Sequence, residues 1–132
     1  MDEDAIMLTG SCLCGAVAFT IPKDRPAPEA CHCNMCRKTT GHFFVSMVVA
    51  KKDVAFTGTD PVTWYDSSQK VRRGFCGKCG STLFFEPNFH DWTAVALGCI
   101  NEPVTTPISR HIFTADKGAY YEILDGAPQN PQ

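Results

Sequence analysis

Short apolar segments alternate with turn residues along the whole chain, and no apolar pattern of helical period extends over the length of an ordinary helix. β-Branched and aromatic residues dominate residues 42–50, which predicts a buried strand. Residues 35–40 are compatible with a short helical turn that Gly41 would stop. The pattern therefore predicts a mainly β fold built from short antiparallel strands. The other predicted strands span 16–21, 54–57, 62–65, 71–75, 81–85, 92–100, 111–114 and 120–124.

The 132 residues contain no internal repeat, linker or charge block, so we expect a single domain over residues 1–132. The acidic start, Met1-Asp2-Glu3-Asp4, is unlike a secretory leader, and no apolar run is long enough to span a membrane. These features predict a cytoplasmic protein with no membrane partner. A formal net charge of −2 argues against a nucleic-acid partner. Exposed strand edges make a homodimer a reasonable expectation, and the proline-containing tail, residues 126–132, is expected to be loose.

Cysteine spacing is the most informative feature of the sequence. Seven of the eight cysteines fall into three tight groups: Cys12-Leu-Cys14, Cys31-His-Cys33-Asn-Met-Cys36 and Cys76-Gly-Lys-Cys79. Disulfide frameworks spread their cysteines to close long loops, whereas metal sites crowd them around one point. Glycines beside the groups permit the tight turns that such a site needs. The spacing therefore favours metal binding over disulfides.

The number of ligands in each group separates two kinds of zinc site. A structural zinc takes four protein ligands, whereas a catalytic zinc leaves one position open. One set supplies four thiols and would close a site, namely Cys12, Cys14, Cys76 and Cys79. The other set supplies three from one short loop, namely Cys31, Cys33 and Cys36. A fourth ligand for this second set could instead come from Cys99, His32, His42, His90 or His111.

Several other residues near the cysteines allow two interpretations. Arg37 and Lys38 could meet a substrate carboxylate or be solvated surface charges. Alternation along residues 71–75 places Arg72 and Arg73 on opposite faces of a strand. Cys99 reads as a small buried residue, and the ring of His32 is expected to point away from the metal. The aromatic residues read first as core and second as pocket walls; they are Phe43, Phe44, Phe84, Phe85 and Trp92.

The motifs around the cysteines resemble one known family. Cys12-x-Cys14-Gly15, Cys31-His32-Cys33-x-x-Cys36-Arg37 and Phe75-Cys76-x-x-Cys79-Gly80-Ser81 are similar to those of the glutathione-dependent formaldehyde-activating enzymes, also called the CENP-V/GFA domain. The resemblance continues through Ser67-Ser68, the block 107–113 with His111, and Asp125-Gly126, and so covers about residues 8–130. One departure is Asn101-Glu102-Pro103, which weakens the transfer of detailed substrate specificity.

The resemblance implies a β-tent, or Mss4-like, fold around two zinc ions per chain. By position, Cys12, Cys14, Cys76 and Cys79 would hold a structural zinc, and Cys31, Cys33 and Cys36 would hold a catalytic one. The family's named activity joins a small thiol, glutathione, to a small aldehyde, formaldehyde, and is that of a carbon–sulfur lyase, S-(hydroxymethyl)glutathione synthase.

Three thiolates on zinc suit this chemistry, because such a centre binds and deprotonates an incoming thiol. The alternative is a non-catalytic, zinc-stabilised interaction module of the Mss4-like type. A module of that type would be expected to lack one of the cysteines between residues 31 and 36 or to carry a basic extension. The sequence has neither feature.

Overall fold

The computed structural model describes residues 7–132, and within them the predicted mainly β architecture is confirmed. The acidic start, residues 1–4, lies outside the described residues. The strands are β1 (Met7–Ser11), β2 (Ala18–Pro22), β3 (Glu29–Cys31), β4 (Phe44–Ala50), β5 (Ala55–Phe56), β6 (Thr63–Asp66), β7 (Val71–Phe75), β8 (Thr82–Pro87), β9 (Trp92–Ala96) and β10 (Arg110–Ile112). The helical elements are α1 (Asn34–Thr40) and the 3-10 turns η2 (Lys51–Asp53), η3 (Leu97–Cys99) and η4 (Thr114–Asp116). None of the described helices is long and apolar enough to cross a membrane.

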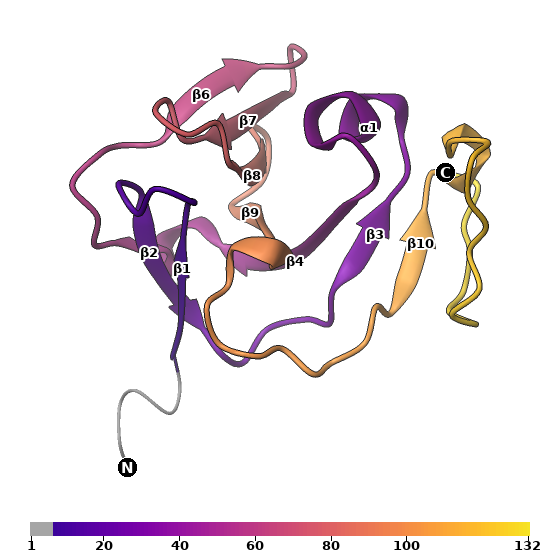
Figure 1. The fold of residues 1–132 in the computed structure, drawn as a ribbon, viewed down its shortest axis with the longest axis horizontal. Coiled ribbons are helices and arrows are strands. Elements are labelled where there is room, and N and C mark those ends of the chain that lie inside the picture. The colour runs from indigo at the N-terminus through magenta and orange to yellow at the C-terminus, as the bar shows by residue number, and fades with distance from the viewer. Residues whose placement is uncertain (1–6) are drawn as a thin grey trace.

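The strands form two sheets, drawn in Figure 1. The smaller has the order β1-β2-β5, and the larger has the order β10-β3-β4-β9-β8-β7-β6. Neighbours are antiparallel, as the pattern predicts, except that β10 runs parallel to β3. The segment 120–124 is not a strand, which corrects that prediction. There the two tyrosines direct their hydroxyls to histidine side chains, and the backbone joins neither sheet.

The main core lies where the two sheets meet. Phe19 of β2 packs against Phe84 of β8, with 5.1 Å between ring centroids, and both rings are buried. Cys12 and Cys76 belong to this same buried cluster. Burial of apolar surface, worth roughly 25 cal/mol per Å², therefore holds the turn after β1 against the turn after β7. This packing brings cysteines that are far apart in the sequence into contact.

The C-terminal segment lies against β10, so the expectation of a loose tail is wrong. The backbone N–H of Asn130 donates to the carbonyl of His111 over 2.8 Å, and the N–H of His111 donates to the carbonyl of Pro128 over 2.8 Å. Gln129 forms a parallel bridge with His111. Figure 1 shows this segment in yellow beside β10. An edge strand offers unpaired backbone groups, and the tail satisfies them.

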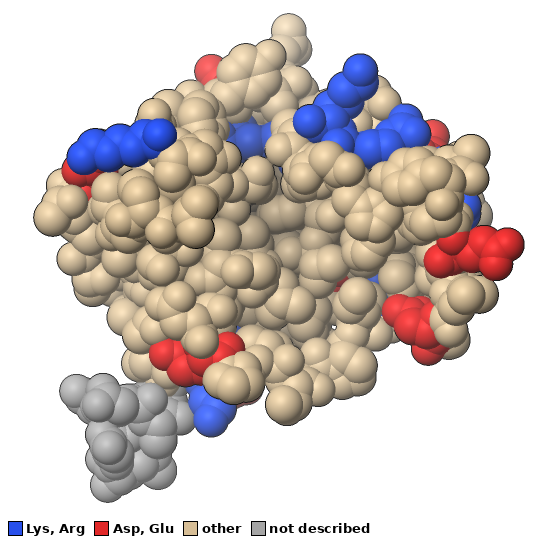
Figure 2. Space-filling view, in the orientation of Figure 1, with Lys and Arg blue, Asp and Glu red and all other residues tan. Residues whose placement is uncertain are grey.

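Charged side chains are sparse over the middle of the face drawn in Figure 2. Lys and Arg gather mostly along its upper edge, and Asp and Glu along its lower and right edges. The hollowed centre of this face is formed by uncharged residues.

Candidate metal centres and active site

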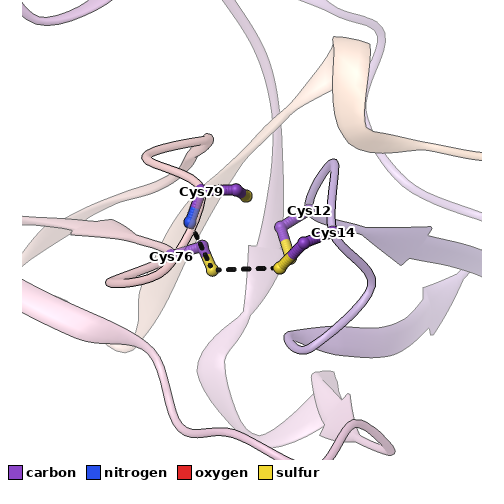
Figure 3. A group of neighbouring side chains, drawn as sticks. All are labelled: Cys12, Cys14, Cys76 and Cys79. Carbon is purple, nitrogen blue, oxygen red and sulfur yellow. Dashed lines mark hydrogen bonds between the residues drawn. The ribbon is translucent and has the colours of Figure 1, made fainter.

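Four cysteines from two distant turns come together, and we call them the four-cysteine cluster (Cys12, Cys14, Cys76 and Cys79). The first two follow β1, and the other two lie between β7 and β8 (Figure 3). Each turn ends in a left-handed glycine, Gly15 with φ 81° and Gly80 with φ 79°. Their N–H groups donate to the carbonyls of Cys12 and Cys76, over 3.1 and 2.8 Å. A residue with a Cβ is strained at such angles, so glycine fits these turns.

The spacing of the four sulfurs fits a tetrahedral zinc ion. All four lie within 4.8 Å of one another; the Cys12–Cys14 distance is 3.6 Å and the Cys14–Cys76 distance is 3.8 Å. Zn–S bonds of about 2.3 Å in a tetrahedron place sulfurs about 3.8 Å apart. The backbone N–H of Val17 donates to the Cys12 sulfur over 3.3 Å, which favours its thiolate. A hydrogen bond with the Ser81 hydroxyl lowers the pKa of Cys79 to about 5. The cluster could therefore hold a metal ion such as zinc.

The second group is the three-cysteine cluster (Cys31, Cys33 and Cys36), whose sulfurs also lie within 4.8 Å of one another. Cys31 ends β3, Cys33 caps the N-terminus of α1, and Cys36 lies in α1 with its side chain buried. The Cys33 sulfur accepts a hydrogen bond from the Cys36 N–H over 3.2 Å. The helix ends at Gly41, where φ is 86°, which confirms the predicted stop. One capped turn thus directs three thiols to one point.

No fourth His, Cys, Asp or Glu side chain of residues 7–132 joins this cluster. The candidate fourth ligands are engaged elsewhere. Cys99 Sγ contacts the carbonyl of Thr82 over 3.1 Å. His42 contacts the Tyr120 hydroxyl over 2.6 Å, and His90 stacks on Trp92 with 5.6 Å between ring centroids. Among residues 7–132 this cluster therefore offers three ligands, one fewer than a four-coordinate ion takes.

The two remaining histidines form a buried chain of hydrogen bonds. The His32 Nε2 lies 2.8 Å from the His111 Nδ1, and the His111 Nε2 lies 2.8 Å from a carboxylate oxygen of Asp125. The other nitrogen of His32 contacts the Tyr121 hydroxyl. The ring of His32 thus turns away from the sulfurs, as expected, and ties the loop of the three-cysteine cluster to the C-terminal segment. Burial is the main cause that lowers the pKa of His32 to about 4.

Arg73 is the one of the two adjacent arginines that lies at the three-cysteine cluster, a choice that the sequence left open. It lies on β7 and is 5% exposed. Its Nη2 is 3.6 Å from the Cys36 sulfur, and its Nη1 is 3.3 Å from the Thr39 hydroxyl. Arg72 points to the opposite face and pairs with Glu86 over 2.6 Å, which confirms the predicted alternation. The signal was available, because two adjacent arginines in one strand force one of them inward.

The environment of the three-cysteine cluster favours a thiolate. Contacts with the Cys31 and Cys36 sulfurs, aided by the Cys36 N–H and the charge of Arg73, lower the pKa of Cys33 to about 2. The same contacts raise the pKa of Cys31, because it lies beside the favoured thiolate. Thiolates are the form of cysteine that binds metals. The donor set therefore fits a soft or borderline ion such as zinc.

A cavity of about 650 Å³ opens beside the three-cysteine cluster. All three cysteines and Arg73 line it. As the first interpretation predicts, Phe84 belongs to the main core and Phe44 to a second buried cluster, against which Phe85 and Trp92 pack. Phe44, Phe85 and Trp92 also line the cavity, which agrees with the second interpretation. Neither Arg37 nor Lys38 lines it; Arg37 contacts Asn34 over 3.0 Å. The cluster therefore faces a space large enough for a small organic molecule.

The divergent segment Asn101-Glu102 fastens β1 rather than shaping this cavity. The two carboxylate oxygens of Glu102 accept from the N–H and the hydroxyl of Thr9, each over 2.6 Å. Asn101 contacts the Thr9 hydroxyl over 3.2 Å. Neither residue lines the cavity beside the cysteines. The departure from the family pattern therefore acts on the joint between β1 and the loop after β9.

Comparison with known families agrees with this geometry. The family described as "Glutathione-dependent formaldehyde-activating enzyme" matches residues 7–116. The chain belongs to this family. A protein of Halomonas elongata that carries the same family name is 27% identical over 128 residues, which cover 89% of this chain and 82% of that protein. A protein of Schizosaccharomyces pombe named as an uncharacterized lyase is 33% identical over 76 residues, which cover 58% of this chain and 55% of that protein.

A solved structure shares the fold of this family member. The crystal structure of a Rhodobacter sphaeroides protein superimposes with a TM-score of 0.61 at 19% sequence identity. The match covers 74% of this chain and 91% of that chain. The shared fold is consistent with the β-tent architecture that the resemblance implies.

Proposed function

We propose that this chain is a zinc-dependent carbon–sulfur lyase that joins a thiol to a small aldehyde and catalyses the reverse reaction. One observation carries the proposal: three thiols meet at the wall of a cavity, with no fourth protein ligand among residues 7–132. The family name and the lyase name of the Schizosaccharomyces pombe relative support the same class of reaction.

Two zinc ions would have different tasks in a single domain spanning residues 1–132. The four-cysteine cluster has a complete donor set and includes two core residues, Cys12 and Cys76, so it would be structural. The three-cysteine cluster lines the cavity, so it would be catalytic. This division follows the general difference between closed structural sites and open catalytic ones.

The reaction needs no oxidant or reductant. The thiol sulfur forms a bond to the carbonyl carbon, the carbon–oxygen π electrons pass to the oxygen, and the proton lost from sulfur ends on that oxygen. A zinc ion bound to the three thiolates would supply a fourth position at which a substrate thiol loses its proton near neutral pH. Cys31, Cys33 and Cys36 hold that position at the cavity wall, and Arg73 offsets the negative charge of the thiolates.

Glutathione and formaldehyde are the substrates that the family name indicates, and we propose them as the first pair to test. The two compounds also combine without a catalyst, so the measurement is the acceleration of their exchange, read by two-dimensional exchange NMR with labelled formaldehyde. Protein carrying two zinc ions per chain is expected to raise the exchange rate. Failure of such protein to accelerate exchange with any thiol and aldehyde would contradict the proposal. One tight zinc per chain with no thiol binding would indicate the interaction module instead.

A further inference from the structure

The cavity beside the three-cysteine cluster is far larger than formaldehyde requires. Its volume is about 650 Å³, whereas formaldehyde has a single carbon and a single oxygen. Its wall beyond the sulfurs is mainly apolar and includes Phe85, Phe89, Trp92 and Phe113. Cavities of this size and lining bury apolar ligand surface, with a few polar groups fixing orientation.

Two aromatic residues of this wall are exposed to solvent. Phe89 is 60% exposed and Phe113 is 41% exposed, and both line the cavity. Exposed apolar residues that gather around one concave site mark a binding surface. Single exposed apolar residues are common, but these two share one cavity.

Phe113 also has a strained backbone. Its φ is 54°, and it is the only non-glycine residue of the described chain with a positive φ. Bulky residues rarely adopt this conformation, and such strain is concentrated at functional sites. Glycine would adopt this conformation without strain.

The charged groups of the cavity do not match a strongly anionic ligand. Two cations line it, Lys70 and Arg73, and two carboxylates do so as well, Glu29 and Asp116. Arg73 already contacts Cys36 and Thr39. The Glu29 carboxylate pairs with Arg110 over 3.1 Å. The site therefore offers no excess positive charge to bind the two carboxylates of glutathione.

We infer that the substrate pair of this site includes a partner with an apolar body, an aromatic ring or a short aliphatic chain, that packs among Phe85, Phe89, Trp92 and Phe113. The apolar body could belong to the thiol or to the aldehyde, because both reacting groups meet at the same sulfur cluster. The reaction rests on the proposed function, whereas binding of the apolar body can be measured separately.

The binding test compares two thiols that differ in one group. Zinc-loaded protein is titrated by calorimetry with 2-phenylethanethiol and with 2-mercaptoethanol, which share an ethanethiol and differ in phenyl against hydroxyl. The phenyl compound is expected to bind at least tenfold more tightly, because the ring buries apolar surface in the cavity. Equal dissociation constants would overturn the inference.

A matched pair of variants locates the binding. Phe89→Ala removes an exposed ring from this cavity. Phe56→Ala removes a ring of similar exposure, 55%, from a different cavity lined by residues of β5 to β9. Phe89→Ala is expected to lose most of the tenfold preference, and Phe56→Ala to keep it. Phe113→Gly removes the second ring and relieves the positive φ, so it is expected to fold with an undiminished Tm and still lose affinity. If both Phe89→Ala and Phe113→Gly keep the preference for the phenyl compound, its phenyl ring binds elsewhere, which would overturn the inference.

Reaction rates show whether the apolar body belongs to the thiol or to the aldehyde, and they test the proposed function separately from the binding inference. One arm pairs 2-phenylethanethiol with formaldehyde, the other pairs glutathione with phenylacetaldehyde, and glutathione with formaldehyde is the reference. A rise of tenfold or more in kcat/KM in one arm assigns the apolar body to that partner. Tight binding of the phenyl compound without acceleration in any arm would contradict the proposed function and leave the binding inference standing. Acceleration of the reference alone would support the function and overturn the inference.

Discussion

The Nη2 of Arg73 lies 3.6 Å from the Cys36 sulfur, between β7 and α1. Arg73 is buried, its Nε has no hydrogen-bond partner among residues 7–132, and its guanidinium carbon lies 5.0 Å from the centroid of the Phe85 ring. A buried cation is stable only beside compensating negative charge. Within the described chain the three-cysteine cluster, in which Cys33 is the favoured thiolate, meets that need.

Arg73→Met is expected to weaken metal binding at the three-cysteine cluster by roughly 10- to 100-fold, the usual effect of removing a partner that supports a metal ligand. Competition with a chromophoric chelator measures this affinity. Arg72→Met is the matched control, because Arg72 is adjacent in sequence and pairs with Glu86 on the other face. Equal affinities in the two variants would show that Arg73 does not support the cluster.

Cys33→Ser is expected to reduce bound zinc from two ions to one per chain and to abolish thiol–aldehyde exchange, because it removes the thiolate that the cluster favours most. Metal analysis and exchange NMR check both outcomes. Cys99→Ser serves as the control, since serine retains a donor for the Thr82 carbonyl and Cys99 belongs to neither cluster. Exchange that persists with one zinc per chain would refute the catalytic role of Cys33.

Cys76→Ser is expected to destabilise the whole fold. The Cys76 side chain is 1% exposed and belongs to the core where the two sheets meet. Loss of a structural zinc removes folding free energy directly, on the order of several kcal/mol. Thermal unfolding should therefore show a much larger fall in Tm for Cys76→Ser than for Cys33→Ser, and similar falls would contradict the division into structural and catalytic sites.

Glu102 makes stability depend on pH. Hydrogen bonds from the Thr9 hydroxyl and N–H lower the pKa of its carboxyl below the ordinary value of 4.5. Its stabilising effect is thus fully present above pH 4.5 and is lost as pH falls through the lower folded pKa. Glu102→Gln should lower Tm by about 2–4 °C at pH 7, and this difference from the parent chain should shrink below pH 4.5. The exposed Glu122→Gln is the control, and a difference that does not vary with pH would contradict the assignment.

The sequence by itself identified the two sets of cysteines that the structure brings together. Ligand spacing such as Cys31-x-Cys33-x-x-Cys36 and the left-handed glycines are local properties, because neighbouring residues cannot move far apart along the chain. The mainly β character of the fold could also be predicted, because the spacing of apolar residues and the types of residue are local properties of the sequence. The fold prediction missed β1 and β3 and extended β9 over residues 97–99, which form the turn η3. It also failed at residues 120–124 and at the tail, where side-chain hydrogen bonds and an available strand edge outweighed local pattern.

Only the tertiary structure decided what surrounds the clusters. The absence of a fourth ligand at the three-cysteine cluster among residues 7–132 depends on where His42, His90 and Cys99 lie. Partners distant in sequence hold His42 and Cys99, whereas His90 stacks on the nearby Trp92. The sequence showed that one of the two arginines, Arg72 or Arg73, points inward. Only the register of β7 decides that it is Arg73. The cavity draws its walls from β3, β4, β7, β8, β9 and β10 as well as α1, and such walls meet only when long-range contacts form. Local spacing therefore indicated which cysteines are candidate ligands, and packing decided which distant pairs meet and what each cluster faces.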